Sequence, residues 1–212
     1  MSDFNPETVE SFEGGIKSSW FNQQLQGNIS IFHYNYEDKQ DISFEKNGGG
    51  VGQYVTRTGN AEANGGEVEL RWLVMESLKL GINYSYLDAK WTKRQLQAIN
   101  FNTAKAETMD ISGASLLSPK HHLIATLDYH YGMNAYGDLA FHADHSFASK
   151  RQFNRADADY YYDYHNRDSA QHFTNLRLSW QHSNKQLQLA LWVENIADNH
   201  YSEVVVPVTA ST

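Results

Sequence analysis

The chain lacks several features that would narrow its class. It has no cysteine among its 212 residues, which excludes disulfide bonds, cysteine-based zinc sites and a cysteine nucleophile. No run approaches the roughly 18 consecutive apolar residues that a membrane-spanning helix needs, and the mean hydropathy is −0.61. The first residues contain no basic segment followed by an apolar one. We therefore predict no secretory signal in this sequence.

Positive charge is also scarce. The chain has 17 Lys and Arg residues but 25 Asp and Glu residues, which gives a net charge of −8. This balance argues against nucleic-acid binding, which normally needs a basic surface. A low mean hydropathy does not exclude membrane β-barrels, because their strands alternate lipid-facing and water-facing residues. Aromatic residues make up 13% of the chain, and such barrels place them in interfacial girdles.

Alternation of apolar and polar residues is the main signal. It runs through residues 65–72, 78–86, 122–131, 138–144, 175–180 and 187–194. A helical pattern fits none of these segments, because positions i and i+3 fall on opposite parities. Eight strands are predicted, over residues 8–20, 25–37, 53–73, 78–91, 119–131, 136–148, 170–181 and 186–197.

The predicted connections alternate between short and long. Short, turn-like segments lie at 20–24, 74–77, 132–135 and 182–185, and long polar ones at 38–52, 92–118 and 149–169. All short connections therefore fall at one end of the sheet, as in transmembrane barrels with tight periplasmic turns. A Greek-key sandwich has no reason to sort its loops this way. Most strands reach 11 residues, enough to cross a bilayer at a tilt.

Aromatic side chains on the apolar parity lie near strand ends, as an interfacial belt requires: Trp20, Trp72, Tyr84, Tyr86, Tyr129 and Tyr131. These patterns predict an all-β fold, an antiparallel transmembrane β-barrel segment.

Seven segments carry a family resemblance by their order and spacing. They are NPETVESFEGGIKSSW (5–20), ISIFHYNYEDKQ (29–40), GNAEANGGEVELRW (59–72), LGINYSYLDAKW (80–91), SPKHHLIATLDYHY (118–131), GDLAFHADHSF (137–147) and LALWVENIADNHY (189–201). The last contains the spacing Asn195-x-x-Asp198-x-x-Tyr201. Over nearly its whole length, the chain resembles the C-terminal part of the barrel of TonB-dependent outer-membrane receptors.

The resemblance implies a fold and a function. Members have 22-stranded barrels in the bacterial outer membrane, closed by an N-terminal plug and energised through TonB. The implied ligand is a metal chelate such as a ferric siderophore, or a similar nutrient. The implied partners are outer-membrane lipid and, only in the intact receptor, TonB and the plug.

The sequence also departs from the family pattern. No plug or TonB box is visible, and the family's last strand is missing after VVVPVTAST (204–212). Residues 1–212 are therefore expected to form about eight meander strands of a larger barrel. Two alternatives stay open: a self-contained eight-stranded outer-membrane protein (adhesin, structural barrel or small channel), and a soluble β-sandwich binding module.

One long segment, 149–169, contains the candidate ligand-binding residues. They are Tyr160, Tyr161, Tyr162, Tyr164, His165 and Arg167. Aromatic rings and an arginine can grip a ferric siderophore or another anionic chelate by stacking and charge-assisted hydrogen bonds. The alternative is that these tyrosines extend the outer aromatic girdle and pack the loops.

The histidines favour no metal site. His121 and His122 are adjacent, so on a strand they point to opposite faces. His142 and Asp144 share a face, which His145 does not, and we interpret the pair as a hydrogen-bonded element of the wall. Charged residues are predicted to line a watery lumen: Glu67, Glu69, Arg71, Lys79, Asp128, Arg177 and Glu194. Neither a Gly-x-Ser-x-Gly elbow nor a His-Glu-x-x-His motif occurs, so we predict no catalytic residues, no cofactor and no enzyme activity.

Overall fold

The computed structural model describes residues 5–46, 52–100, 105–151 and 169–201. Eight strands form one antiparallel sheet in chain order. They are β1 (Thr8–Trp20), β2 (Leu25–Lys46), β3 (Gly52–Met75), β4 (Leu78–Lys93), β7 (His121–Gly132), β8 (Asp138–Ala148), β9 (Gln171–Gln181) and β10 (Gln188–Val193). A short 3-10 turn, η1 (Asn134–Tyr136), joins β7 to β8. Within the described ranges, no helix is long and apolar enough to cross a membrane.

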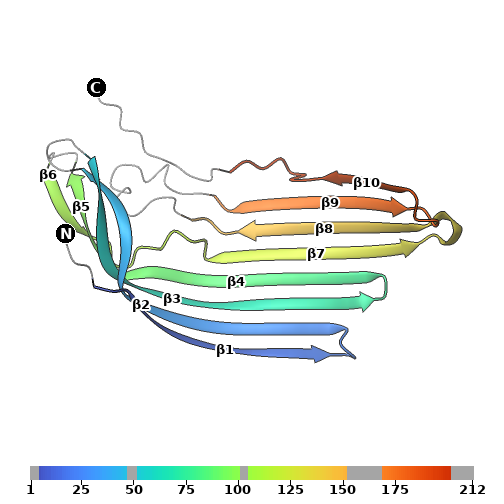
Figure 1. Ribbon diagram of the computed structural model, residues 1–212, viewed down its shortest axis with the longest axis horizontal. Coiled ribbons are helices and arrows are strands. Elements are labelled where there is room, and N and C mark those ends of the chain that lie inside the picture. Colours follow the sequence, from blue (N-terminus) through green and yellow to red (C-terminus); the bar gives the residue numbers. More distant parts are fainter. Residues whose placement is uncertain (1–4, 47–51, 101–104, 152–168, 202–212) are drawn as a thin grey trace, which may run out of the picture.

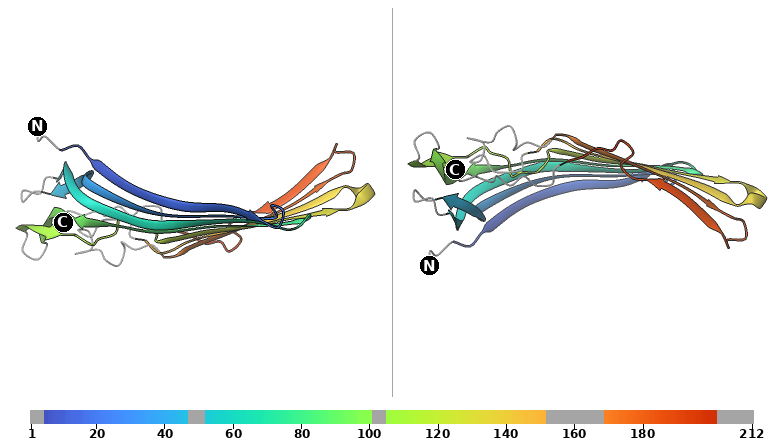
Figure 2. Two further views of the ribbon diagram at one scale, coloured as in Figure 1. Left: turned by 90° about the horizontal axis from the view of Figure 1, so that it is seen from below. Right: turned by 90° about the horizontal axis from the view of Figure 1, so that it is seen from above.

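The sheet is a single curved layer (Figures 1 and 2). Four short turns lie at one end, which we call the turn end, and the longer connections lie at the other, the loop end (Figure 1). The sorted connections predicted from the sequence are thus confirmed. β1 and β10 are the two edges of the sheet and do not pair with each other. The described strands therefore form neither a closed eight-stranded barrel nor a two-layered sandwich.

The register places most apolar residues on one face of the sheet and most polar residues on the other, most clearly near the turn end. One register-connected row crosses all eight strands and is wholly apolar: Trp20, Leu25, Trp72, Leu80, Leu127, Ala143, Leu176 and Val193. The next row faces the opposite way and is polar or glycine: Ser19, Gln26, Arg71, Gly81, Thr126, Asp144 and Asn175. We call these the apolar face and the polar face.

No part of the described chain covers the apolar face. Ile16 on β1 is 73% exposed and Leu191 on β10 is 75% exposed. A contiguous exposed apolar surface of this extent is what a membrane or another protein must cover. The fold is the all-β antiparallel meander of a transmembrane barrel, as the sequence predicted.

Two strands are longer than predicted. β2 and β3 stay paired through Lys46 and Gly52, across most of the segment 38–52 that was expected to be a connection. The register shifts between Tyr36 and Lys39, and beyond this bulge the hairpin bends away from the plane of the sheet (Figure 1). A bulge bends the strand and increases its twist. The predicted strand over 53–73 already included most of the β3 side of this hairpin, whereas the β2 side was expected to be a connection.

The long segment 92–118 also contains regular structure that the sequence analysis missed. β5 (Gln95–Asn100) and β6 (Lys105–Asp110) form a separate antiparallel hairpin at the loop end. The last strand is shorter than predicted: the strand expected over 186–197 ends at Val193. The residues after it form a turn that is described below.

Candidate functional site

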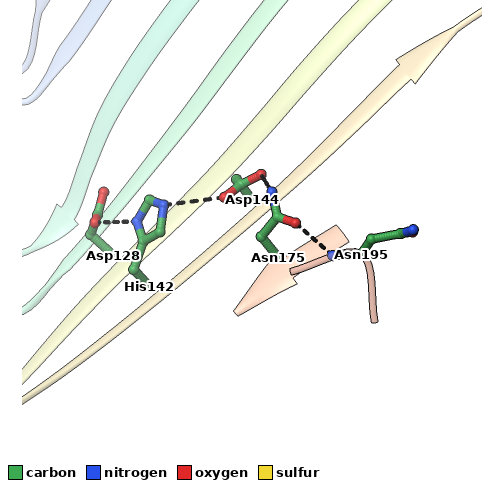
Figure 3. A network of polar contacts seen from close by, with 5 residues as sticks. All are labelled: Asp128, His142, Asp144, Asn175 and Asn195. Carbon is green, nitrogen blue, oxygen red and sulfur yellow. Dashed lines mark hydrogen bonds and ion pairs between the residues drawn. The ribbon is translucent and has the colours of Figure 1, made fainter. Parts of the chain in front are cut away.

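A chain of polar contacts crosses the polar face from β7 to the end of β10 (Figure 3). Nδ1 of His142 lies 2.8 Å from Oδ1 of Asp128, and its Nε2 lies 3.5 Å from Oδ1 of Asp144. Asn175 donates from Nδ2 to Asp144 at 2.8 Å, and its Oδ1 accepts the backbone N–H of Asn195 at 2.8 Å. We call these five residues the polar chain. Side chains on the three successive strands β7, β8 and β9 are thereby linked to one another and to the backbone just after β10.

The same face carries charge contacts on the other half of the sheet. Asn28 on β2 donates to Oε2 of Glu69 at 2.7 Å, and Arg71 lies 2.6 Å from its Oε1. Lys79 pairs in register with Asp128, and Arg177 with His142. The prediction that these charges share one face is therefore confirmed for the residues within strands. Glu194 lies beyond the last residue of β10.

The residues after β10 form a turn fastened to β9. Asn195 adopts a left-handed conformation with φ of 50°. Its side chain accepts the backbone N–H of Asn199 at 3.1 Å and donates to the carbonyl of Asn199 at 2.8 Å. Tyr201 accepts the backbone N–H of His172 through its hydroxyl at 2.9 Å. The Asn-x-x-Asp-x-x-Tyr spacing is therefore a local turn, not a continuation of the strand.

The histidines lie as their strand positions predicted. His121 is on the apolar face, where its Nδ1 lies 2.8 Å from the hydroxyl of Tyr84, and His122 is on the opposite face. His145 points away from His142 and lies 2.8 Å from the hydroxyl of Thr174. Within the described ranges, no group of three or more His, Asp or Glu side chains is placed to hold a metal ion.

A stripe of aromatic rings lies on the polar face near the loop end. Phe32, Tyr34 and Tyr36 alternate along β2, with ring centroids 5.4 Å and 6.4 Å apart. Their register partners on β3 are small: Gly65, Ala63 and Ala61, in that order. We call the three rings the aromatic stripe. The sequence analysis assigned it no role, although the change of parity at Phe32 was the visible signal.

A small buried cluster lies beside the stripe and fastens the segment after β6 to the sheet. Ala61, Trp91 and Ile111 are buried, and Tyr36, Ala114 and Leu116 pack against them. Arg94 is 1% exposed, with its guanidinium carbon 4.5 Å from the centroid of the Trp91 ring. Backbone hydrogen bonds add to these contacts, for example from Trp91 N to Ala114 O at 2.9 Å. Together they hold the segment after β6 against the sheet at the loop end.

Asp110, at the end of β6, closes the turn that leads into this cluster. Its carboxylate accepts the backbone N–H of Ser112 at 2.9 Å and the Ser112 hydroxyl at 2.6 Å. These hydrogen bonds favour the charged form and hold the pKa of the Asp110 carboxyl below its usual range. Ser112 in turn accepts the backbone N–H of Arg94 at 3.2 Å. The turn therefore ties β6 back to the end of β4.

The predicted ligand-binding cluster lies outside the described residues. Tyr160, Tyr161, Tyr162, Tyr164, His165 and Arg167 all fall within 152–168. The segment joins β8 to β9 at the loop end, the end that also carries the aromatic stripe.

An antiparallel meander with one exposed apolar face, one polar face and sorted connections is a segment of a transmembrane β-barrel. The family model described as "TonB dependent receptor-like, beta-barrel" matches residues 2–196. The chain therefore belongs to the TonB-dependent receptor β-barrel family, a family of outer-membrane receptors, as its sequence landmarks predicted.

Solved structures of siderophore receptors share this fold. The ferric-catecholate import receptor Fiu from E. coli K12 is 17% identical with a TM-score of 0.67, over 95% of this chain and 25% of its own. The ferric yersiniabactin uptake receptor FyuA from Yersinia pestis is 16% identical with a TM-score of 0.70, over 97% and 27%. BauA, the ferric preacinetobactin receptor from Acinetobacter baumannii, is 15% identical with a TM-score of 0.62, over 93% and 26%. The chain thus spans about a quarter of the length of these structures.

Proposed function

We propose that this chain forms part of the barrel of an outer-membrane receptor that imports a metal chelate, such as a ferric siderophore, with energy supplied through TonB. The observation that carries the proposal is the two-faced antiparallel sheet, in a chain that the family model matches over residues 2–196. The similar structures are named as a ferric-catecholate import receptor, a ferric yersiniabactin uptake receptor and a ferric preacinetobactin receptor.

The two faces of the sheet suit different parts of that task. The apolar face supplies the surface that lipid covers, and the six strands between β1 and β10 each pair with a neighbour on both sides, which satisfies backbone groups as a bilayer demands. The polar face supplies a hydrated wall, where the polar chain and the Asn28–Glu69–Arg71 contacts hold the charged side chains in place. The open edges at β1 and β10 need further strands, which we propose the rest of a larger barrel provides.

The ligand enters at the loop end in this proposal. The segment 149–169 connects two strands at that end. It has the residue types that bind an anionic chelate: Tyr160, Tyr161, Tyr162, Tyr164, His165 and Arg167. We propose that it contributes to capture. The plug of the intact receptor and TonB would then release the chelate into the lumen.

A transport assay tests the proposed function. Cells that lack the gene are supplied with a radioactive ferric siderophore under iron limitation, with and without a plasmid that restores the gene. We expect uptake only with the gene, and loss of uptake when TonB is deleted. Uptake that is equal in both strains across a panel of catecholate, hydroxamate and mixed chelates would contradict a role in iron-chelate import.

A second comparison tests the loop. Replacing Tyr160, Tyr161, Tyr162 and Tyr164 together by Ser should weaken chelate binding at least tenfold, because the stacking surfaces are lost. A matched variant with the exposed Tyr136 replaced by Ser changes a tyrosine in a connection at the turn end, and should bind normally.

A further inference from the structure

Toward the loop end, the apolar face ends in a border of histidine and tyrosine side chains. Across β2, β4, β7, β8 and β9 the border consists of His33, Tyr84, Tyr86, His121, His145 and His172. We call these six residues the histidine border. Because outer-membrane barrels carry their long connections on the outside of the cell, this border is expected at the headgroup level of the outer leaflet.

Two histidines of the border are oriented by a hydroxyl group on the neighbouring strand. Nδ1 of His121 lies 2.8 Å from the hydroxyl of Tyr84, and Nδ1 of His145 lies 2.8 Å from the hydroxyl of Thr174. When the hydroxyl donates to Nδ1, the neutral ring carries its proton on Nε2. Within the described ranges, Nε2 of neither ring has a hydrogen-bond partner. Each ring can therefore present an N–H donor at its tip.

Contacts between rings support the border. The ring centroids of His121 and Tyr86 lie 5.2 Å apart. The ring of His172 lies 5.7 Å from that of His145 and 4.9 Å from that of Phe147. His121 and His172 are nevertheless exposed. The rings are thus held by their neighbours and remain open to the surroundings of the sheet.

Two lysines lie just beyond the border. Nζ of Lys120 lies 2.6 Å from Oδ1 of Asp88, and Nζ of Lys90 lies 3.0 Å from Oε1 of Glu62. Asp88 and Glu62 have the strand parity of Tyr86, so both pairs lie on the side of the apolar face. The lysine side chains are 52% and 40% exposed, respectively. Because an ammonium group has three N–H donors, each lysine can contact its carboxylate and still donate outward.

These donors suit a group that only accepts hydrogen bonds and carries negative charge. A phosphate in a lipid headgroup is such a group, and lysines near a membrane surface are attracted to anionic lipids. Aromatic rings alone would be enough for an interfacial girdle, which requires neither imidazole N–H donors nor ammonium groups. The apolar face continues directly below the border and would contact the acyl chains of the same lipid.

We propose that the histidine border and the two lysines bind the phosphate group of a lipid headgroup in the outer leaflet, with Lys120 and His121 at the centre of the site. The inference goes beyond the proposed function, because it depends on the membrane placement of the barrel and on no chelate. The polar face has no part in it.

Native mass spectrometry tests the inference on the protein extracted from outer membranes, in the length that the cell produces. The probes are dioleoyl phosphatidic acid and dioleoylglycerol, which have the same acyl chains and differ by the phosphate, added in a nonionic detergent. We expect the unsubstituted protein to bind the phosphatidic acid about tenfold more tightly or better. Lys120→Met/His121→Leu should lose most of this preference, whereas Lys120→Arg should keep it within about threefold.

Lys79→Met/His122→Leu is the matched control, because it removes one ammonium group and one imidazole from the polar face. This variant should keep the preference for phosphatidic acid. Heat-modifiable gel migration verifies that every variant is folded. The inference is overturned if the unsubstituted protein has no preference, if Lys120→Met/His121→Leu retains it, or if the control loses it equally.

Inorganic phosphate distinguishes a lipid site from a site for small anions. Added at the concentration of the lipid, it should leave phosphatidic acid bound, since it lacks acyl chains to contact the apolar face. Displacement of the lipid would overturn the assignment to a headgroup. The uptake assay above is independent of these results: a protein that prefers phosphatidic acid but restores no chelate uptake contradicts the proposed function alone.

Discussion

The ring of Phe32 on β2 lies directly over the backbone of Gly65, its register partner on β3. The contact needs a residue without a side chain, because a Cβ at Gly65 would meet both the ring and the carbonyl oxygen of Tyr86, which lies 2.5 Å from its position. Such close approach is a common reason for glycine inside a strand. The absence of a side chain at Gly65 thus leaves room for the Phe32 ring against the backbone of β3.

Gly65→Ala should therefore destabilise the sheet. We expect a loss of about 1–3 kcal/mol, the usual cost of forcing extra volume into a packed contact, measured by urea unfolding in detergent micelles. Gly14→Ala is the control, because nothing lies within 4 Å of a Cβ at Gly14. A Gly65→Ala variant as stable as Gly14→Ala would show that the Phe32 ring moves aside freely.

A charge on the apolar face should impair membrane insertion. Ile82 lies on that face between Leu70 and Ala125, whereas its neighbour Asn83 points to the polar face. Ile82→Lys should cost about 2–4 kcal/mol, the price of a lysine facing lipid near the bilayer midplane, and Asn83→Lys should cost little. The measurement is the folded fraction after transfer into phospholipid vesicles. Equal insertion of the two variants would contradict the assignment of the faces.

Removing the imidazole from the polar chain should loosen the joined strands. His142→Leu leaves the carboxylates of Asp128 and Asp144 without the ring between them. Because the His142 side chain is 41% exposed, water replaces part of the lost contact, and we expect about 1 kcal/mol of destabilisation in urea unfolding. His122→Leu, at an exposed position on the same face of β7, should change stability by less than about 0.5 kcal/mol.

The turn at Asp110 should respond to acid. Because hydrogen bonds from Ser112 lower the pKa of the Asp110 carboxyl, their stabilisation is fully present above the usual aspartate range and is lost as the pH falls through the lowered value. The carboxyl carbon can be titrated by NMR. Ser112→Ala should raise this pKa toward its ordinary value, whereas Ser115→Ala, in the same segment, should leave it unchanged. An Asp110 pKa that is unchanged in the Ser112→Ala variant would contradict hydrogen bonding from Ser112 as the cause of the lowered pKa.

Much of the sheet could be predicted because a strand buried on one face must alternate. The parity of Leu70, Ile82 and Leu127 already placed them on the apolar face, and the register confirms it. The two-residue repeat of side-chain direction along a strand was enough to place His142 and His145 on opposite faces. The extension of β2 beyond Tyr36 and the β5–β6 hairpin were not predicted, because the register shift after Tyr36 and the separate pairing of β5 with β6 depend on contacts between strands.

The candidate site was less accessible to such reasoning. The proposed ligand cluster around Tyr160 to Arg167 was chosen by composition alone and stays a prediction. The aromatic stripe left a local signal, but its significance depends on Gly65, Ala63 and Ala61, about 25 to 33 residues away in the chain, being brought beneath it. The polar chain likewise joins residues from Asp128 to Asn195, and no local pattern specifies which carboxylate a histidine will meet.

The sequence by itself determined the two-faced strands, the sorted connections and the family, because side-chain alternation and turn chemistry are local properties of the chain. Only the tertiary structure decided which side chains meet across strands. Contacts such as Phe32 on Gly65 and Asp128 with His142 depend on the strand register, which arises from pairing between distant segments.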